Sequence, residues 1–186
     1  MWGILAAVVI GFLIVVVAIG IYAVLAYNRF INLKNAIEST FNQIRVAMKK
    51  RLDKITALVK ATKSYVKYER STLAKITGLR RMKMESAADI ERAETKFRAV
   101  VPSIMAVMEN YPDLKAEKTV SKLMQEVSSV EDEIARLRYL YNDQVQMFNA
   151  MTERFPTNII ASLLGFGKKP YLRVEEEAER PVDTSF

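Results

Sequence analysis

The sequence predicts an all-α protein: an N-terminal transmembrane helix continues into an elongated antiparallel three-helix bundle or coiled coil, followed by a short C-terminal fourth helix. Three observations predict this class. The chain begins with a long apolar stretch, apolar residues then recur every three or four positions, and turn formers are scarce, with six Gly and five Pro in 186 residues. We expect an anchor at residues 1–28, a helical bundle at residues 29–168 and an acidic, disordered tail at residues 169–186.

The N-terminal stretch Trp2–Asn28, called the apolar segment below, carries no charged side chain. As a helix it would reach roughly 40 Å, enough to cross a hydrocarbon core of roughly 30 Å. Trp2 lies at one end, with Tyr22 and Tyr27 near the other, where aromatic rings favour the membrane interface. A cleaved signal peptide is the alternative, but the segment is too long and lacks both a basic start and a cleavage site. We therefore predict a permanent anchor in a lipid bilayer.

The cations next to the apolar segment predict its orientation. No Lys or Arg precedes it, whereas Arg29, Lys34 and Arg45 follow it. By the positive-inside rule, the N-terminus lies outside and the C-terminal domain is cytoplasmic. The same three side chains are the candidates for contact with lipid headgroups.

Charge is unevenly distributed along the chain, which has a net charge of +7. Residues 28–84 are strongly basic and contain only the acids Glu38, Asp53 and Glu69, whereas the later residues are acidic overall. The basic helix either pairs with acidic helices inside the bundle or attracts anionic headgroups. Because screening acts beyond about 8 Å, only the cations next to the membrane serve the second use. We favour pairing inside the bundle.

The first helix is expected to run on from the anchor without a break. No Gly or Pro follows the apolar segment until Gly78. Apolar positions at coiled-coil spacing predict a packing face along it. The positions of this face are Ile37, Phe41, Ile44, Met48, Leu52, Ile55, Val59, Thr62, Val66, Glu69, Leu73 and Ile76.

Two further long helices follow a charged turn at residues 79–86. The second is expected to kink or restart at Pro102, which lacks a backbone donor, and to end before Pro112. The third runs from about Leu114 to Phe155, and residues 131–133 on it are either solvated or face the basic first helix. Its packing face comprises Val120, Leu123, Val127, Val130, Ile134, Leu137, Tyr141, Val145, Phe148, Thr152 and Phe155.

A short apolar helix is expected at the C-terminal end of the bundle. Pro156 ends the third helix, Thr157 or Asn158 caps the next one, and Gly165 closes it. If the three long helices alternate in direction, this helix lies far from the membrane, where it either meets a neighbouring subunit or caps the bundle. The candidates for an oligomer or partner interface are Phe155, Ile159, Ile160, Leu163, Leu164 and Phe166.

Composition excludes several kinds of chemistry. The chain has neither Cys nor His, which rules out disulfides, Cys/His metal ligation, thiol chemistry and a His base. It contains neither a phosphate-binding loop motif nor an H-E-x-x-H motif. We predict no catalytic, cofactor-binding or metal-binding residue and no enzyme activity. Lys49, Lys50 and Arg51 lack interleaved aromatic residues, so nucleic acid is not a predicted partner.

Several motifs resemble the LemA family across residues 1–172. They are Tyr27-Asn28, Arg51-Leu52-Asp53, YPDLKA at 111–116, Glu131/Ile134/Arg138/Tyr141-Asn142 at helical spacing, and FPTNIIASLLGF at 155–166. The chain departs from the family pattern at residues 53–59, which read DKITALV instead of DLIPNLV, and at Tyr68-Glu69, where the family has a His-Glu pair. The resemblance implies a single-pass protein of the bacterial inner membrane with a long cytoplasmic helical bundle.

These observations predict a non-enzymatic, membrane-anchored scaffold that self-associates through its helical bundle in the bacterial cell envelope. Its predicted partners are the lipid bilayer and further copies of the chain, with Ala7 and Gly11 spaced for a close helix contact in the membrane. One alternative is a membrane-shaping oligomer in organelle or envelope biogenesis, which the magnetosome proteins of the same family suggest. The other is an adaptor for a membrane protease or another envelope protein.

Overall fold

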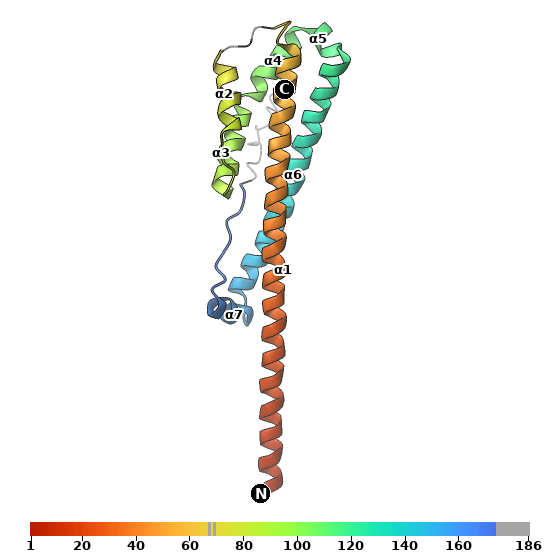
Figure 1. The fold of residues 1–186 in the computed structure, drawn as a ribbon. Coiled ribbons are helices and arrows are strands. Elements are labelled where there is room, and N and C mark those ends of the chain that lie inside the picture. Colours follow the sequence, from red (N-terminus) through yellow and green to blue (C-terminus); the bar gives the residue numbers. More distant parts are fainter. Residues whose placement is uncertain (67, 69, 174–186) are drawn as a thin grey trace, which may run out of the picture. The chain divides into compact units, whose positions relative to one another are not determined.

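The computed structural model describes residues 1–66, 68 and 70–173, and within these residues all regular structure is helical (Figure 1). The predicted all-α class is therefore confirmed. The helices are α1 (Trp2–Thr62), α2 (Arg70–Arg80), α3 (Ala87–Arg98), α4 (Val101–Asn110), α5 (Pro112–Ala116), α6 (Lys118–Glu153) and α7 (Thr157–Leu164).

The contacts divide the chain into two compact units. Unit 1 combines Met1–Ser39 with Asp143–Pro170, and unit 2 combines Thr40–Asn142 with the chain from Tyr171 onward. Each unit contains one part of α1 and one part of α6, because both long helices pass through the boundary.

In unit 2 the two long helices pack side by side in opposite directions. Lys50 Nζ lies 3.0 Å from Glu133 Oε2, and Lys54 Nζ lies 2.6 Å from Glu126 Oε2. Residue numbers thus rise along α1 in the direction in which they fall along α6. The hydrogen bond from Lys54 lowers the pKa of the Glu126 carboxyl below its usual value. These contacts confirm that basic residues of the first helix pair with acids of the third.

The predicted packing faces form the core of unit 2. The buried residues from them are Ile44, Met48, Leu52, Ile55, Val59, Thr62, Val66 and Ile76, and on the other long helix Val120, Val127, Val130, Ile134 and Tyr141. Spacing of three and four residues places such side chains on one stripe of a helix, which buries them together.

The predicted continuation of the first helix to Gly78 is wrong, because α1 ends at Thr62. The amides of Tyr65 and Val66 both bond to Thr62 O, at 3.0 and 3.1 Å, which closes a turn. The hydroxyl of the fully buried Thr62 donates back to Leu58 O at 2.8 Å. Thr, Ser, Tyr and Val are weak helix formers, and they cluster after this point. Glu69, a predicted packing position, lies outside the described residues.

Local sequence accounts for the starts of α3 and α4, whereas α2 and α5 were not predicted as separate helices. Ser86 and Asp89 form a capping box at the start of α3, and the Ser86 hydroxyl, 2.8 Å from Asp89 Oδ2, lowers the pKa of that carboxyl. The predicted interruption near Pro102 is confirmed, because α3 ends at Arg98 and α4 begins at Val101, with Pro102 in its first turn. Proline fits there because the first amides of a helix have no intrahelical acceptor.

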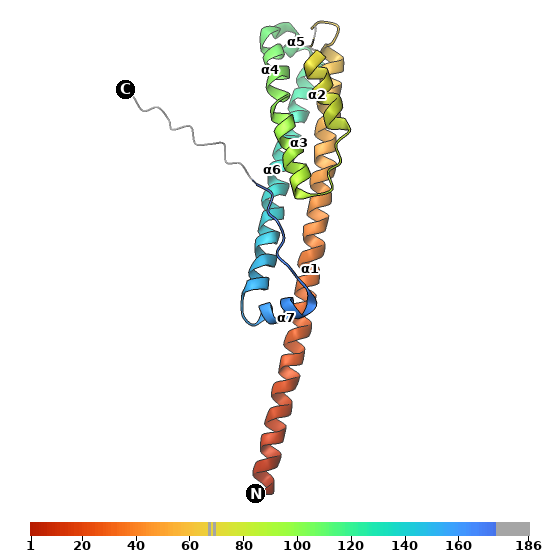
Figure 2. The same cartoon turned by 90° about the vertical axis from the view of Figure 1, so that its left-hand side faces the viewer.

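Unit 1 is built from the first part of α1, the last part of α6 and α7 (Figure 2). Its buried residues include Ala26, Phe30 and Ile37 on α1 and Ala161 on α7. Gly165 closes α7 with a φ of 72°, a left-handed conformation that glycine adopts without steric cost. The expected side-chain cap is absent: the Thr157 hydroxyl instead lies 2.7 Å from Met151 O, to which it donates.

Residues 169–173, which the sequence assigned to a disordered tail, are described as an extended segment without helix. Leu172 is fully buried, and the amide of Arg173 donates to Glu91 Oε1 at 3.0 Å in unit 2. The remaining tail residues, 174–186, lie outside the described residues.

Candidate functional site

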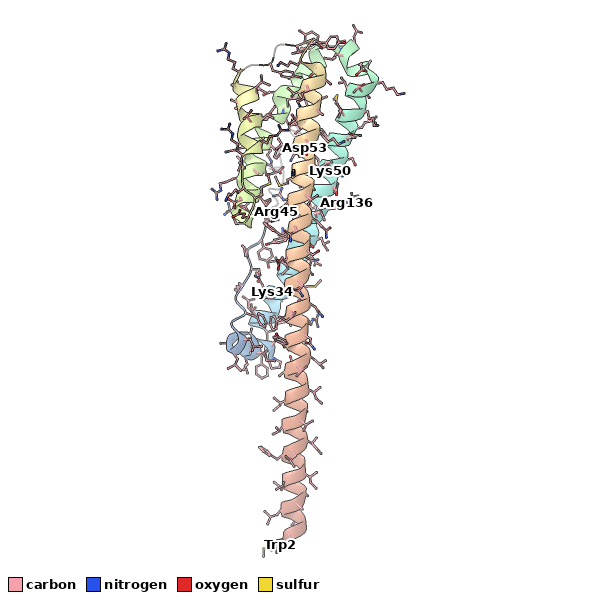
Figure 3. All side chains as sticks on the ribbon, in the orientation of Figure 1. Trp2, Lys34, Arg45, Lys50, Asp53 and Arg136 are labelled. Carbon is pink, nitrogen blue, oxygen red and sulfur yellow. The ribbon has the colours of Figure 1, made fainter. Side chains whose placement is uncertain are left out.

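Most of the apolar segment is exposed, whereas Ala26 near its end is buried. Every residue from Met1 to Tyr22 is exposed, and one 18-residue window of α1 has a mean hydropathy of 3.2 with none of it buried. By length and composition this helix can cross a membrane, as a membrane anchor or a signal sequence would. Trp2 marks its free end in Figure 3 and is 90% exposed.

A cluster of aromatic rings begins where this exposure ends, within unit 1. Phe30 of α1 is stacked on Phe166, with ring centroids 4.7 Å apart, and meets Phe148 of α6 edge-on at 5.5 Å. Tyr27 lies 6.3 Å from Phe166, so this predicted interface residue joins the cluster. Phe30 and Phe148 are 0% and 1% exposed. Offset and edge-on ring pairs of this kind add to the stabilisation from burial alone.

The aromatic cluster docks α7 and leaves one side of it uncovered. Ala161 is buried and Ile160 and Phe166 are partly buried. Four other predicted interface residues remain exposed and form what we call the open face: Phe155 (81% exposed), Ile159 (51%), Leu163 (79%) and Leu164 (50%). Ile159 and Leu163, four residues apart, lie on one side of α7, and Phe155 lies in the turn that precedes it.

The expected placement of the short helix, far from the apolar segment, is wrong. Its neighbours Tyr27 and Phe30 directly follow the exposed part of α1. The reason lies in the number of passes: the turn after Thr62 starts α2, and α3 with α4 makes a return pass before α6 begins. The reversal after Thr62 adds one pass, α2, to the three that were predicted, so α6 is the fourth pass and runs antiparallel to α1. The end of α6 therefore lies beside α1 residues of unit 1.

The predicted headgroup candidates lie in different settings along α1. Arg29 and Lys34 are exposed in unit 1, and Arg45 is exposed in unit 2, where its Nη1 donates to Asn42 Oδ1 at 3.2 Å (Figure 3). Arg29 lines a groove of about 590 Å³ together with Arg154. The other residues of this groove are Tyr22, Leu25, Ala26, Asp143, Gln146, Met147, Ala150, Met151, Phe155 and Thr157.

Two asparagines of α6 hold the extended segment, one in each unit. In unit 1, Asn149 Oδ1 accepts from Lys169 N at 2.8 Å and its Nδ2 donates to Lys169 O at 2.9 Å. In unit 2, Asn142 makes the same two bonds with Leu172, at 2.9 and 2.7 Å. Each side-chain amide thus bonds to both the N–H and the C=O of one backbone residue, as a neighbouring β-strand would. We call these two contacts the asparagine clamps; only the heptad spacing of the two asparagines could have indicated them.

Replacing Asn142 with aspartate should release the clamp on Leu172 and lower the free energy of unfolding by about 1–3 kcal/mol, because the Leu172 carbonyl loses its donor. Urea unfolding of the full chain in mild detergent measures this change. Trypsin should also cut faster after Arg173. The exposed Asn35 of α1 serves as control, since Asn35→Asp changes a side chain at the surface and should change neither readout. Equal cleavage rates in both variants would contradict a role for the clamp.

Unit 2 contains a buried ion-pair cluster centred on Arg51 of α1, which is 5% exposed. Its Nη1 lies 3.0 and 3.1 Å from the two carboxylate oxygens of Glu94, and its Nη2 lies 2.8 Å from Glu131 Oε1. The guanidinium also sits 4.6 Å from the centre of the Phe97 ring. One side chain therefore joins α1 to α3 and α6, the kind of bidentate and stacked contact that a lysine cannot reproduce.

The described residues hold no group of three or more His, Cys, Asp or Glu side chains that could bind a metal ion. Among the ion pairs within them, Lys50–Glu133, Lys54–Glu126 and Arg51–Glu94 join different helices. The arrangement presents three features: an exposed apolar helix, an open apolar face beside it in unit 1 and a set of paired helices in unit 2.

This arrangement defines a class of all-helical proteins in which one apolar helix runs unbroken into a bundle and packs antiparallel to a second long helix. A model of the LemA family matches residues 40–186. The chain belongs to the LemA family, as the resemblance of its motifs implied.

Relatives with curated names agree with this assignment. Protein LemA of Metamycoplasma hominis is 28% identical over 162 residues, covering 85% of this chain and 74% of that protein. Magnetosome protein MamQ 2 of Paramagnetospirillum magneticum is 28% identical over 92 residues, or 50% of this chain and 34% of that protein. Magnetosome protein MamQ of Magnetospirillum gryphiswaldense is 25% identical over a stretch of the same length. The match thus spans about a third of the MamQ proteins.

Proposed function

We propose that this chain is a membrane-anchored, non-enzymatic scaffold of the bacterial inner membrane that self-associates. The observation that carries the proposal is α1: one unbroken helix from Trp2 to Thr62 whose first residues are exposed on every side. A helix satisfies its own backbone hydrogen bonds, and lipid can cover such a surface where water cannot. The absence of Cys and His from the chain supports a structural rather than a catalytic role.

The continuity of α1 gives the anchor a mechanical role. Ala26 and Phe30, which directly follow the exposed residues, are 6% and 0% exposed in the core of unit 1. Because no loop separates the two parts, the direction of the anchor is transmitted to that core. Arg29 and Lys34 support a cytoplasmic C-terminal domain. Protease treatment of intact cells tests this orientation, because digestion of a C-terminal tag from outside would overturn it.

Self-association within the bilayer is supported by a row of small residues. Gly3, Ala7 and Gly11 recur every four positions on α1, and a Cβ added at either glycine would meet no atom within 4 Å. Small residues at this spacing let two transmembrane helices approach closely. The exposed row leaves space for the same helix of a second copy.

Replacing both Ala7 and Gly11 with isoleucine should reduce oligomers several-fold while leaving membrane insertion intact, because bulk then separates the two helices. Energy transfer between labelled copies in vesicles, with mass photometry in mild detergent, measures the change. Val9→Ile is the matched control, since Val9 lies on the opposite side of the helix. A monomeric wild-type chain would overturn the scaffold proposal, and unchanged oligomers in the double variant would exclude this row as the contact.

Membrane shaping is a second candidate function, favoured by the similarity to the two magnetosome proteins. In this version the oligomers bend the bilayer that anchors them. Purified full-length chain reconstituted into vesicles and imaged by electron microscopy distinguishes the two, because tubes or buds support membrane shaping and unchanged vesicles support a scaffold alone. Crosslinking with mass spectrometry should show contacts between copies, whereas a stoichiometric foreign partner would favour an adaptor role.

A further inference from the structure

The open face at α7 is an apolar surface that none of the described residues covers. Phe155 and Leu163 are about four-fifths exposed, at 81% and 79%, and Ile159 and Leu164 are half exposed. Contiguous exposed apolar patches on a folded protein mark a contact with a membrane, a ligand or another protein. The opposite side of α7, at Ala161, is buried, so the helix is docked rather than loose.

The position of α7 along α1 distinguishes among these contacts. Leu25 is 63% exposed in the apolar segment, and Phe30, five residues later, stacks on Phe166 directly after α7. At 1.5 Å per residue, these two α1 residues differ in height by roughly 7.5 Å. The headgroup layer on each side of the hydrocarbon core is about 5–8 Å thick. If α1 spans a bilayer, α7 therefore lies at the depth of the headgroups (Figure 2).

The charges near α7 complement anionic lipid. Arg154 precedes the helix, and Lys168 and Lys169 follow it, while Arg29 stands on α1 of the same unit. Glu153 forms an ion pair with Lys168, and Asp143 lines the groove with Arg29 and Arg154. Among these described side chains, the cations therefore exceed the acids by four to two. An apolar helix face bordered by Lys and Arg is the composition of helices that lie in a membrane surface.

The groove beside α7 has the same mixed character. Its apolar wall includes Leu25, Met147 and Phe155, and its two arginines are Arg29 and Arg154. With a volume of about 590 Å³ it has room for the upper part of an acyl chain, with its phosphate next to arginine. Arginine binds phosphate oxygens through two parallel N–H donors.

We propose that α7 lies in the headgroup layer of the bilayer that α1 crosses, with its open face among the acyl chains and its flanking cations on anionic phospholipid phosphates. This inference rests on the proposed membrane anchoring. It gives the protein a second, lateral contact with the membrane, which fixes the rotation of unit 1 about α1 as well as its depth. A helix alone can turn in a bilayer, whereas a helix with a docked side arm resists turning.

Because the native chain has no Cys, single cysteines carrying a polarity-sensitive fluorophore report local depth. Full-length chain with Leu163→Cys is reconstituted into vesicles of phosphatidylcholine and phosphatidylglycerol that contain lipid quenchers at shallow positions. Ile14→Cys, inside the apolar segment, tests the anchoring, and Asn35→Cys, roughly 15 Å beyond Leu25, is the aqueous control. We expect strong shallow quenching at position 163, deep quenching at position 14 and little quenching at position 35.

Each of the other outcomes contradicts either the anchoring of α1 or the placement of α7. Quenching at position 14 but not at position 163 overturns the inference and leaves the anchoring intact. A probe at position 163 that is shielded from water yet unquenched by lipid shows that protein, such as a second copy, covers the open face, and this also overturns the inference. No quenching at position 14 overturns the anchoring and the inference together.

Charge provides an independent measurement. In the Leu163→Cys background, Arg154→Gln and Lys169→Gln should each lower the ratio of inserted to free probe about fivefold in anionic vesicles, and have little effect in neutral ones. Lys34→Gln is the matched control: this exposed cation was a headgroup candidate from the sequence, but it lies nine residues, or roughly 13.5 Å, beyond Leu25 and therefore outside the headgroup layer. Equal effects of all three substitutions, or no dependence on anionic lipid, would overturn the role of the flanking cations.

Discussion

Replacing Arg51 with alanine is expected to lower the free energy of unfolding by about 3–5 kcal/mol, the usual cost of removing one partner from a buried ion pair. The Arg51 and Glu94 side chains are 6% and 14% exposed, so the carboxylate would remain in the protein interior without its cation. Contacts with Phe97 and Glu131 would be lost at the same time. Urea unfolding of the full chain in mild detergent, followed by circular dichroism, measures the change.

The neighbouring residue provides the control for this prediction. Lys50 forms a 3.0 Å ion pair with Glu133, but the two side chains are 51% and 40% exposed. Lys50→Ala should therefore cost less than about 1 kcal/mol. If Arg51→Ala does not accumulate, Arg51→Lys keeps the charge but not the bidentate geometry and should fall between the two. Equal effects at positions 50 and 51 would show that the buried cluster contributes no special stability.

Phe148→Ala should have a comparable effect, about 3–5 kcal/mol, because it opens a cavity in the core of unit 1. The ring is 1% exposed and meets Phe30 at 5.5 Å and Phe166 at 6.2 Å. Without it the support of α7 is lost, so trypsin should also cut faster after Lys168. Urea unfolding and timed proteolysis of the full chain provide the two readouts.

Phe155→Ala is the matched substitution on the same segment of chain. Its ring is 81% exposed, so its removal should change the free energy of unfolding in detergent by no more than about 0.5 kcal/mol. A large loss at Phe155 would show that another surface covers it, and a small loss at Phe148 would mean that the aromatic cluster is loosely packed.

Much of the helical architecture follows from local patterns. Spacing of three and four residues identified the core positions of α1 and α6, and Pro102, Pro112 and Pro156 marked helix starts and ends. The excess of basic residues in the first helix and acids in the third predicted their pairing, which Lys50–Glu133 and Lys54–Glu126 confirm. These features depend on residues close in sequence or on summed charge, and both can be read without coordinates.

The turn after Thr62 and the asparagine clamps were not predicted. The turn contains neither Gly nor Pro, and its apolar spacing continues through Val66, so periodicity alone favoured an uninterrupted helix. The clamps join Asn142 to Leu172 and Asn149 to Lys169, contacts between distant residues that leave no local pattern. Arg51 was noted only as part of a basic run, because its burial depends on helices far along the chain.

The sequence by itself determined the helical class, the apolar segment, the packing faces and membership in the LemA family. Each depends on composition, periodicity or motif identity. Only the tertiary structure decided where the short C-terminal helix lies. One added pass, α2, reverses the direction of α6, which brings α7 beside Tyr27 and Phe30 at the end of the apolar segment. The number of chain reversals decides which helix ends lie next to each other. The reversal after Thr62 depends on contacts between residues far apart in the sequence, which local spacing does not reveal.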